Sequence, residues 1–177
     1  WDSSYKRAME TALRLERPVI MWFTDSDRSP ICKRLESEVW RSREFRNFAK
    51  DRVVRIKFDF NVTKGDSSLR LRKKKYLESL KEQYKALGVP TVVVLTADGQ
   101  FVHRERGYTS GQAEFYYQQL KFRVEQAEQR YQALRARLEK DGYRDWRSRD
   151  GSQLFAKPMA LRDGKLLLQR LDKKRLV

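Results

Sequence analysis

Apolar and polar residues alternate along the chain in patterns that predict both strands and helices. The apolar run at 18–23 is short, β-branched and aromatic, and it ends in a polar cluster, which is typical of a buried strand. In residues 52–60 apolar and polar side chains alternate, so a second strand is expected there. Residues 91–96 predict a third strand, and residues 101–108, which follow an Asp-Gly turn, predict its hairpin partner.

Apolar residues three and four positions apart predict the helices, which fall in residues 3–16, 29–50, 69–87 and 109–140. The second helix has a clear beginning, because Ser29 suits the N-cap and Pro30 suits the first helical position. The third helix is expected to bury Tyr76, Leu80, Tyr84 and Leu87. Helices that alternate with strands in this way define an α/β fold class.

The last predicted helix carries a strict heptad seam, made of Tyr117, Leu120, Val124, Ala127, Tyr131, Leu134 and Leu138. Thr109 and Gln112 are expected to form a capping box at its start, and Lys140 lies near its end. Such a helix would be about 45 Å long, more than one small domain needs. Its first half is expected to pack on the sheet. Its second half then needs a cover, either the C-terminal residues or a second copy of the chain in a homodimer.

The composition is strongly basic, with a formal net charge of +16, but the excess is spread along the chain. The one dense run is Arg70–Lys75, and most of the remaining charge is interpreted as a solvated surface. Nucleic acid is not the expected partner, because the aromatic residues fall at core spacings and do not interleave with the basic ones. No apolar run approaches the ~20 residues of a membrane span. Since the chain begins at Trp1, we expect a trimmed or processed product.

The chain has one cysteine, Cys32, and one histidine. A single cysteine excludes an intramolecular disulfide, a redox pair of cysteines and a multi-cysteine zinc site. A metal site would need clustered carboxylates, and none lie at ligand spacing. Neither a metal nor any other cofactor is therefore expected.

The stretch Phe23–Lys33, with sequence FTDSDRSPICK, resembles the active-site segment of the thioredoxin superfamily. The nearest pattern is that of bacterial secreted or periplasmic members, which reads F-T-G-S-D-W-C-x-W-C-K before a helix. Arg28 stands where that pattern has Trp, and Ser29 stands where it has the first, nucleophilic Cys. The CxxC motif is therefore degenerate to SxxC, while Cys32 keeps the second, resolving position.

A second signature supports the same resemblance. The sequence GVPT at 88–91 is similar to the family's cis-proline motif, so Pro90 is expected to follow a cis peptide bond. The resemblance covers residues 1–125 and implies a thioredoxin-like fold with an extra N-terminal helix and a long last helix that continues to about residue 140. It also implies a periplasmic or secreted bacterial protein.

Residues 141–177 resemble a small SH3-like β unit called Sla homology domain one. The residues that fall on its pattern are Trp146, Asp150, Gly151, Ala156, Asp163, Gly164, Leu166 and Leu168. We expect strands at about 153–161 and 165–171, with support from the long helix, because so short a unit buries little surface. The family's last strand would lie beyond the end of this chain, so the unit is expected to be incomplete.

Loss of the attacking sulfur at Ser29 excludes dithiol–disulfide exchange within this chain. The resemblance therefore favours a non-redox binding or scaffold protein of the bacterial cell envelope, which recognises a protein or peptide by strand addition. The groove for this partner would be formed by Arg28, Ser29, Pro30, Ile31, Val89 and Pro90. The alternative is a thiol–disulfide oxidoreductase that acts as a monothiol through Cys32. A third hypothesis, ranked last, is a nucleic-acid or anionic-polymer binder that uses Arg70–Lys75.

Overall fold

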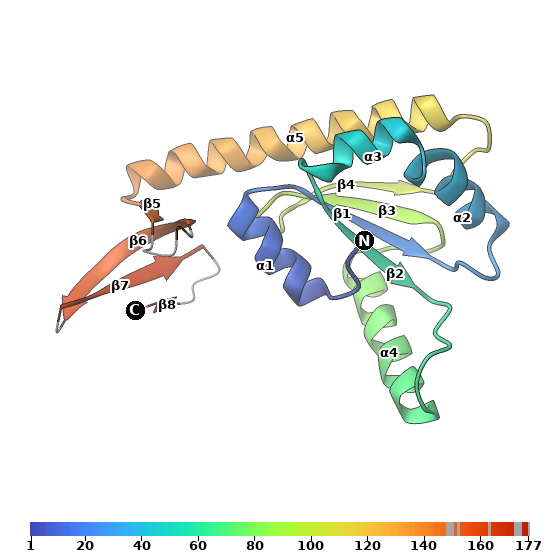
Figure 1. The fold of residues 1–177 in the computed structure, drawn as a ribbon, viewed down its shortest axis with the longest axis horizontal. Helices are drawn as coiled ribbons and strands as arrows, with labels where there is room; N and C mark the ends of the chain where they lie inside the picture. Colours follow the sequence, from blue (N-terminus) through green and yellow to red (C-terminus); the bar gives the residue numbers. More distant parts are fainter. Residues whose placement is uncertain (148–150, 152, 163, 172–174, 177) are drawn as a thin grey trace.

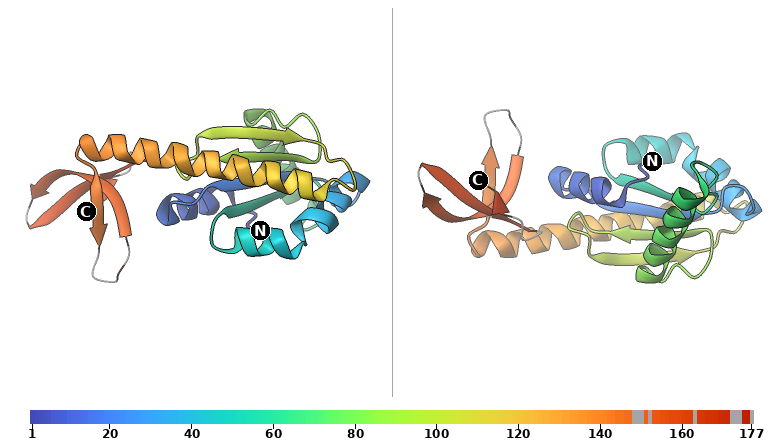
Figure 2. Two further views of the ribbon diagram at one scale, coloured as in Figure 1. Left: turned by 90° about the horizontal axis from the view of Figure 1, so that it is seen from above. Right: turned by 90° about the horizontal axis from the view of Figure 1, so that it is seen from below.

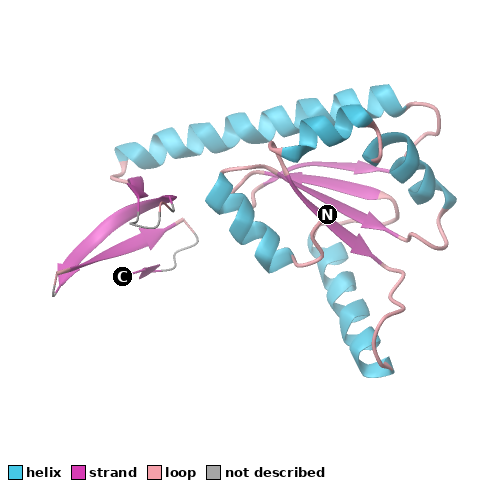
Figure 3. Cartoon of the chain, in the orientation of Figure 1, coloured by secondary structure: helices cyan, strands magenta, loops and turns pink. Residues whose placement is uncertain are grey.

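The computed structural model describes residues 1–177 except 148–150, 152, 163, 172–174 and 177. The elements of the first part are α1 (Tyr5–Leu15), β1 (Val19–Thr24), α2 (Pro30–Leu35), the π-helical turn η1 (Glu36–Trp40), α3 (Arg43–Lys50), β2 (Val54–Asp59), α4 (Ser67–Gln83), β3 (Thr91–Leu95), β4 (Phe101–Arg106) and α5 (Ala113–Lys140). A smaller part follows, with β5 (Arg144–Arg147), β6 (Gln153–Arg162), β7 (Lys165–Arg170) and β8 (Arg175–Leu176). Figure 3 shows the helices and strands of both parts.

The first part is built on a sheet with strand order β2-β1-β3-β4. Strands β1 and β2 are parallel, with Val19 opposite Val54, whereas β3 is antiparallel to both of its neighbours. Helices cover both faces of this sheet. One face carries α1 and α4, and the other carries α2, η1, α3 and α5 (Figures 1 and 2).

Two apolar clusters fill the spaces between the layers, because alternate residues of each buried strand point to opposite faces. In β1, Met21 and Phe23 pack toward α1 and α4, while Ile20 and Trp22 pack toward α3 and α5. Every residue of β1 is buried, as expected for a central strand covered on both sides.

The helix predicted over 29–50 is not continuous. It is divided into α2, η1 and α3, and Ser42 begins α3 by accepting a hydrogen bond from the N–H of Phe45 across 3.1 Å. Leu35, Val39 and Phe45 are all buried, as predicted. With the break, α2, η1 and α3 all bury apolar side chains in the same cluster against the sheet.

The helix predicted over 69–87 begins earlier, at Ser67, and ends earlier, at Gln83. Lys85, two residues after the end of the helix, has a left-handed backbone conformation with φ of 50°. Leu80 and Tyr84 are buried as expected, but Leu77 is buried in place of Tyr76. Leu87 lies beyond the helix and is 77% exposed, so its predicted burial is wrong.

Helix α5 ends at Lys140, as predicted, but its start differs from the expectation. The N-cap is Gln112 and makes no side-chain capping bond, so the capping box with Thr109 is wrong. The seam buries Leu120, Val124, Ala127 and Tyr131. Leu134 and Leu138, in its second half, are only half-buried.

The second part of the chain is an antiparallel sheet with strand order β5-β6-β7-β8. The indole N–H of Trp146 donates to the carbonyl oxygen of Ala156 across 3.0 Å, and Ala156 is fully buried. Asp150 and Asp163, which belong to the SH3-like pattern, lie outside the described residues. The two strands predicted at 153–161 and 165–171 are confirmed as β6 and β7, and each predicted end lies within one residue of the observed end. The SH3-like assignment stays a prediction.

Arg135 of α5 connects the two parts. Its guanidinium group forms ion pairs with Glu16, at the end of α1, and with Asp145 of β5. It also lies 4.1 Å from the ring centroid of Phe155 in β6. These contacts place the β unit beside the C-terminal half of α5, as Figures 1 and 2 show.

Candidate functional site

The candidate site begins where β1 ends. After Thr24 the chain forms a tight turn in which the Asp25 carboxylate accepts hydrogen bonds from the N–H groups of Asp27, at 3.3 Å, and Arg28, at 3.0 Å. The N–H of Ser29 donates to the Asp25 carbonyl oxygen across 3.2 Å. Asp25 thus closes the turn and delivers the chain to the start of α2.

Asp59, at the end of β2, fixes the same turn from the neighbouring strand. Its carboxylate accepts hydrogen bonds at 3.1 Å from the N–H groups of Ser26 and Asn61, and Lys57 Nζ lies 3.5 Å away. Burial alone would raise the pKa of Asp59, but the hydrogen bonds outweigh it, so this pKa lies below its ordinary value. Asp59 was not among the residues predicted from the sequence. The available signal was a polar residue at the end of the strand parallel to β1.

Ser29 and Cys32 form the first turn of α2. Ser29 is the N-cap, and its hydroxyl oxygen accepts a hydrogen bond from the N–H of Cys32 across 3.3 Å. Pro30 follows at the first helical position, as predicted. Cys32 is a free cysteine and only 1% exposed, so its thiol faces the interior of the protein.

Pro90 lies at the same end of the sheet. The peptide bond between Val89 and Pro90 is cis, the isomer that the resemblance implied. Thr91 is the register partner of Phe23, so Pro90 lies beside the residue that opens the Asp25 turn. The carbonyl oxygen of Pro90 accepts a hydrogen bond from the N–H of Gly107 across 2.8 Å, which secures this segment against the end of β4.

The predicted groove residues therefore lie near the same end of the sheet, but they differ in how much of each side chain is exposed to solvent. Three of them, Arg28, Pro30 and Ile31, are exposed, and Ile31 has 47% of its surface free. Ser29 and Val89 are half-buried, and Pro90 is buried. Their use as a peptide groove stays a prediction.

Two cavities lie elsewhere. One of about 320 Å³ lies between β3, β4 and the first half of α5. The other, of about 1080 Å³, lies between α1, α5 and the β unit. Neither is lined by Cys32 or by the residues of the predicted groove.

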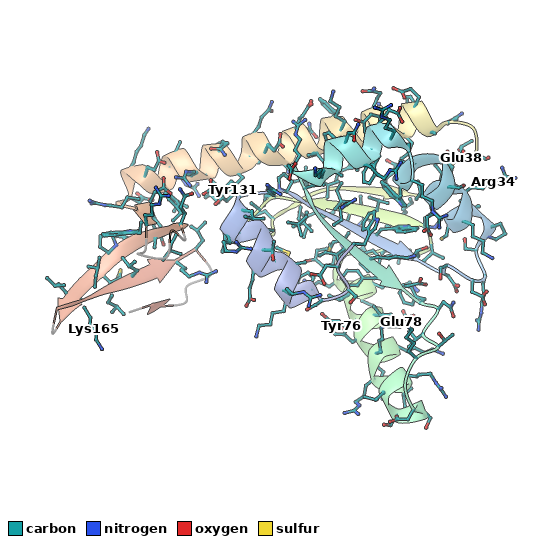
Figure 4. All side chains as sticks on the ribbon, in the orientation of Figure 1. Arg34, Glu38, Tyr76, Glu78, Tyr131 and Lys165 are labelled. Carbon is teal, nitrogen blue, oxygen red and sulfur yellow. The ribbon has the colours of Figure 1, made fainter. Side chains whose placement is uncertain are left out.

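A carboxylate network ties the start of α5 to the helix that carries the thiol. Glu38 of η1 accepts hydrogen bonds from the Tyr108 hydroxyl, from Ser110 Oγ at 3.0 Å and from the N–H of Gly111 at 2.9 Å. Figure 4 shows Glu38 and Arg34 at this end of the molecule, and Arg34 also donates to Ser110 Oγ, across 2.7 Å.

This network shifts the pKa values of its members. The hydrogen bond from Tyr108 holds the pKa of Glu38 below its ordinary value. Burial, together with the same hydrogen bond, raises the pKa of Tyr108 to about 12. The pair therefore keeps a carboxylate and a neutral phenol over the ordinary pH range.

Within the described ranges, no group of three or more His, Cys, Asp or Glu side chains is arranged to hold a metal ion. None of the helices that the structure describes combines the length and the apolar character that crossing a membrane requires.

The fold and this turn define a protein with a thioredoxin-like domain: a buried strand runs into a capped helix that carries a cysteine, beside a cis-proline strand. The family model described as thioredoxin-like domain matches residues 5–123, and the chain belongs to this family. The predicted α/β thioredoxin-like fold is thus confirmed, with a C-terminal β unit beside it.

The chain is similar to named proteins of the same family. A disulfide bond reductase, DsbH of Chlamydia pneumoniae, is 30% identical over 121 residues, which cover 68% of this chain and 70% of the relative. A solved structure described as DsbH oxidoreductase matches with a TM-score of 0.60 and 25% identity, and covers 71% of this chain and 84% of that one. A thioredoxin from Thermus thermophilus matches with a TM-score of 0.51 and 21% identity over 69% of this chain and 85% of that one, a likeness of fold alone.

These relatives overturn the expectation of a non-redox binding or scaffold protein. The relative at 30% identity is named as a disulfide bond reductase, and the structural match is named as an oxidoreductase. The expectation was wrong because it ranked the alternative, thiol chemistry through Cys32 alone, below a binding role, and the named relatives favour that alternative. Disulfide exchange needs one attacking thiolate, and the chain keeps a thiol at Cys32.

Proposed function

We propose that this protein is a thiol–disulfide oxidoreductase that acts as a monothiol through Cys32 on the disulfide of a protein or peptide partner. The observation that carries this proposal is the position of Cys32: it lies one turn into a helix that Ser29 caps, directly after the central strand β1. The named reductase relative supports the same chemistry.

The reaction is a thiol–disulfide exchange in two steps. The Cys32 thiolate attacks one sulfur of the partner's disulfide, whose S–S bond breaks while a Cys32–partner disulfide forms and the second partner sulfur leaves as a thiolate. A second thiol, from the partner or from a low-molecular-weight thiol such as glutathione, then attacks the partner sulfur of this mixed disulfide. Cys32 leaves as the thiolate, ready for another cycle, and no cofactor is required.

Access to the sulfur controls the rate of the first step. Because Cys32 is 1% exposed, the first turn of α2 has to open before a partner sulfur reaches it. Exposed Pro30 and Ile31 lie directly before the thiol and would contact the partner. The backbone beside Pro90 would pair with an extended partner segment. We assign this exchange to the bacterial periplasm or a secreted location, where partner disulfides persist.

The test follows the recovery of activity by scrambled ribonuclease, whose disulfides are mispaired, in a glutathione buffer. The wild-type chain is expected to speed this recovery, and Cys32→Ala is expected to lose the whole effect while circular dichroism reports an unchanged fold. Mass spectrometry of acid-quenched samples should find the ribonuclease linked to Cys32. Equal recovery with wild type and Cys32→Ala, or no mixed disulfide on Cys32, would overturn the proposal.

A further inference from the structure

The first half of α4 lies outside the hydrophobic core. All residues from 63 to 76 are exposed, and the first buried side chains of this helix are Leu77 and Leu80. Figure 1 shows α4 extending away from the sheet, with its N-terminal end farthest from the other helices. This half of the helix is therefore free to contact something outside the domain.

Its charge is of one sign. Between Ser67 and Leu77 the helix carries five cations, Arg70, Arg72, Lys73, Lys74 and Lys75, and no carboxylate. In the described part of the chain, none of these cations takes part in a salt bridge; Arg70 donates to the carbonyl oxygen of Gly65 across 3.0 Å. Cations in the N-terminal half of a helix oppose the helix dipole, so the run does not serve helix stability.

Exposed apolar side chains lie among these cations. Leu71 is 56% exposed, and Lys74 and Lys75 lie three and four positions after it, so the three side chains share one face of the helix. On the other side, Leu69 is 49% exposed and Tyr76 is 45% exposed (Figure 4). A leucine one helical turn from two lysines, at a projecting end of the helix, offers both an apolar contact and a positive charge.

We propose that the first half of α4 docks this protein onto the anionic surface of a phospholipid bilayer. The five cations attract the phosphate groups of the lipids, and the lysine stems let their ammonium groups reach the headgroups while Leu71 enters the interface below them. The exposed leucines favour a bilayer over a nucleic acid as the partner of this surface. A single-stranded nucleic acid would stack on aromatic residues interleaved with the cations, but the run Arg70–Lys75 contains no aromatic residue, and Tyr76 follows it.

The test measures binding of the full chain to sedimented vesicles that contain phosphatidylglycerol, with pure phosphatidylcholine vesicles as the reference. We expect binding to the anionic vesicles only. The double variant Lys74→Gln/Lys75→Gln should bind about twenty-five-fold more weakly, because each lysine near an anionic surface contributes about fivefold. The matched control, Lys50→Gln/Lys140→Gln, removes the same charge from exposed positions outside α4 and should bind like the wild type.

Leucine variants test the apolar contact. Leu71→Ala should weaken binding at least about threefold, an effect that persists at high salt, whereas Leu87→Ala, at a more exposed position outside the helix, should change nothing. Equal loss in the α4 and control lysine variants would overturn the proposal. The proposal would also be overturned if the protein bound a DNA duplex more tightly than the anionic vesicles and Leu71→Ala changed the binding of neither. Cys32 takes no part in these measurements, so their outcome is independent of the thiol chemistry.

Discussion

The hydroxyl oxygen of Ser29 accepts a hydrogen bond from the N–H of Cys32 across 3.3 Å, so Ser29 caps the helix that buries the thiol of Cys32. The two residues are one helical turn apart. This relationship connects the local stability of α2 with the reactivity of Cys32, because the thiol becomes accessible only when that turn opens.

Replacement of the Ser29 cap should therefore increase the reaction rate of the Cys32 thiol. Ser29→Ala removes the hydrogen bond to the N–H of Cys32 and should destabilise the first turn of α2 by about 1 kcal/mol. Alkylation of Cys32 by iodoacetamide under native conditions should become about fivefold faster. Mass spectrometry of samples quenched over time measures this rate.

The matched control is Ser42→Ala, which removes the N-cap of α3 and its 3.1 Å hydrogen bond from Phe45. It should lower the stability of the protein by a similar amount and leave the alkylation rate unchanged. Equal acceleration in both variants would mean that Cys32 reacts through global unfolding and that the Ser29 cap has no special effect.

Introduction of a second sulfur at position 29 should give this site dithiol chemistry. In Ser29→Cys the two cysteines would stand at the start of α2 in the CxxC spacing, and mild oxidation should join them in a disulfide. Reduction of insulin by the reduced variant, measured as turbidity, should exceed that of wild type by at least about tenfold, since the resolving thiol is now in the same chain. Ser29→Cys/Cys32→Ala, with one thiol, is the control. Two free thiols after oxidation would contradict the prediction.

The Glu38 network predicts how stability depends on pH. Its hydrogen bond with Tyr108 lowers the pKa of Glu38 in the folded protein, so its stabilising effect is fully present above the ordinary glutamate pKa and is lost as the pH falls through the lowered value. The difference in thermal midpoint between wild type and Glu38→Gln should be largest near neutral pH and should vanish in acid. Thermal unfolding followed by circular dichroism across this range measures it.

The control for this experiment is Glu82→Gln. Glu82 is exposed, and its side chain makes no hydrogen bond in the part of the chain that the structure describes. Its thermal midpoint should follow wild type at every pH. A pH-independent difference for Glu38→Gln would show that the carboxylate charge does not act through Tyr108.

Arg135 should decide how firmly the two parts of the chain are joined. We propose that residues 1–125, with the helix continuing to 140, and residues 141–177 form separate units, and Arg135 contacts Glu16, Asp145 and Phe155 across their junction. Arg135→Leu should therefore increase trypsin cleavage within 141–147 several-fold and leave the thermal midpoint of the larger unit nearly unchanged.

Arg137→Leu is the matched control, because it removes the same charge from an exposed position on the same helix. It should be cleaved like wild type. Unchanged cleavage of Arg135→Leu would contradict a junction held by this side chain, and a cooperative loss of the whole fold would contradict the division into two units.

The sequence predicted the strands and the position of the turn well, for a local reason. The period-two pattern of 52–60 and the apolar run before Thr24 depend only on neighbouring residues, and both strands are present, as β2 and β1. The cap at Ser29 was equally readable, because an N-cap bonds to a residue three positions away. The fold class followed from these elements and their order.

The same reasoning failed where distant segments meet. The break at Ser42 and the burial of Leu77 in place of Tyr76 result from packing against the sheet, which overrides helical periodicity. The contact of Asp59 with Ser26 joins β2 to the turn after β1, and the two residues are 33 positions apart in the sequence, so no local pattern predicts it.

By itself, the sequence determined that this chain has one thiol, at the start of a capped helix in an α/β domain, since composition and local periodicity are enough for that. Only the tertiary structure decided that the thiol is buried, that the turn before it is held by Asp59, and that the basic half of α4 stands free of the core. Burial and long-range hydrogen bonds depend on which segments the folded sheet brings together, and that arrangement is a property of the whole chain.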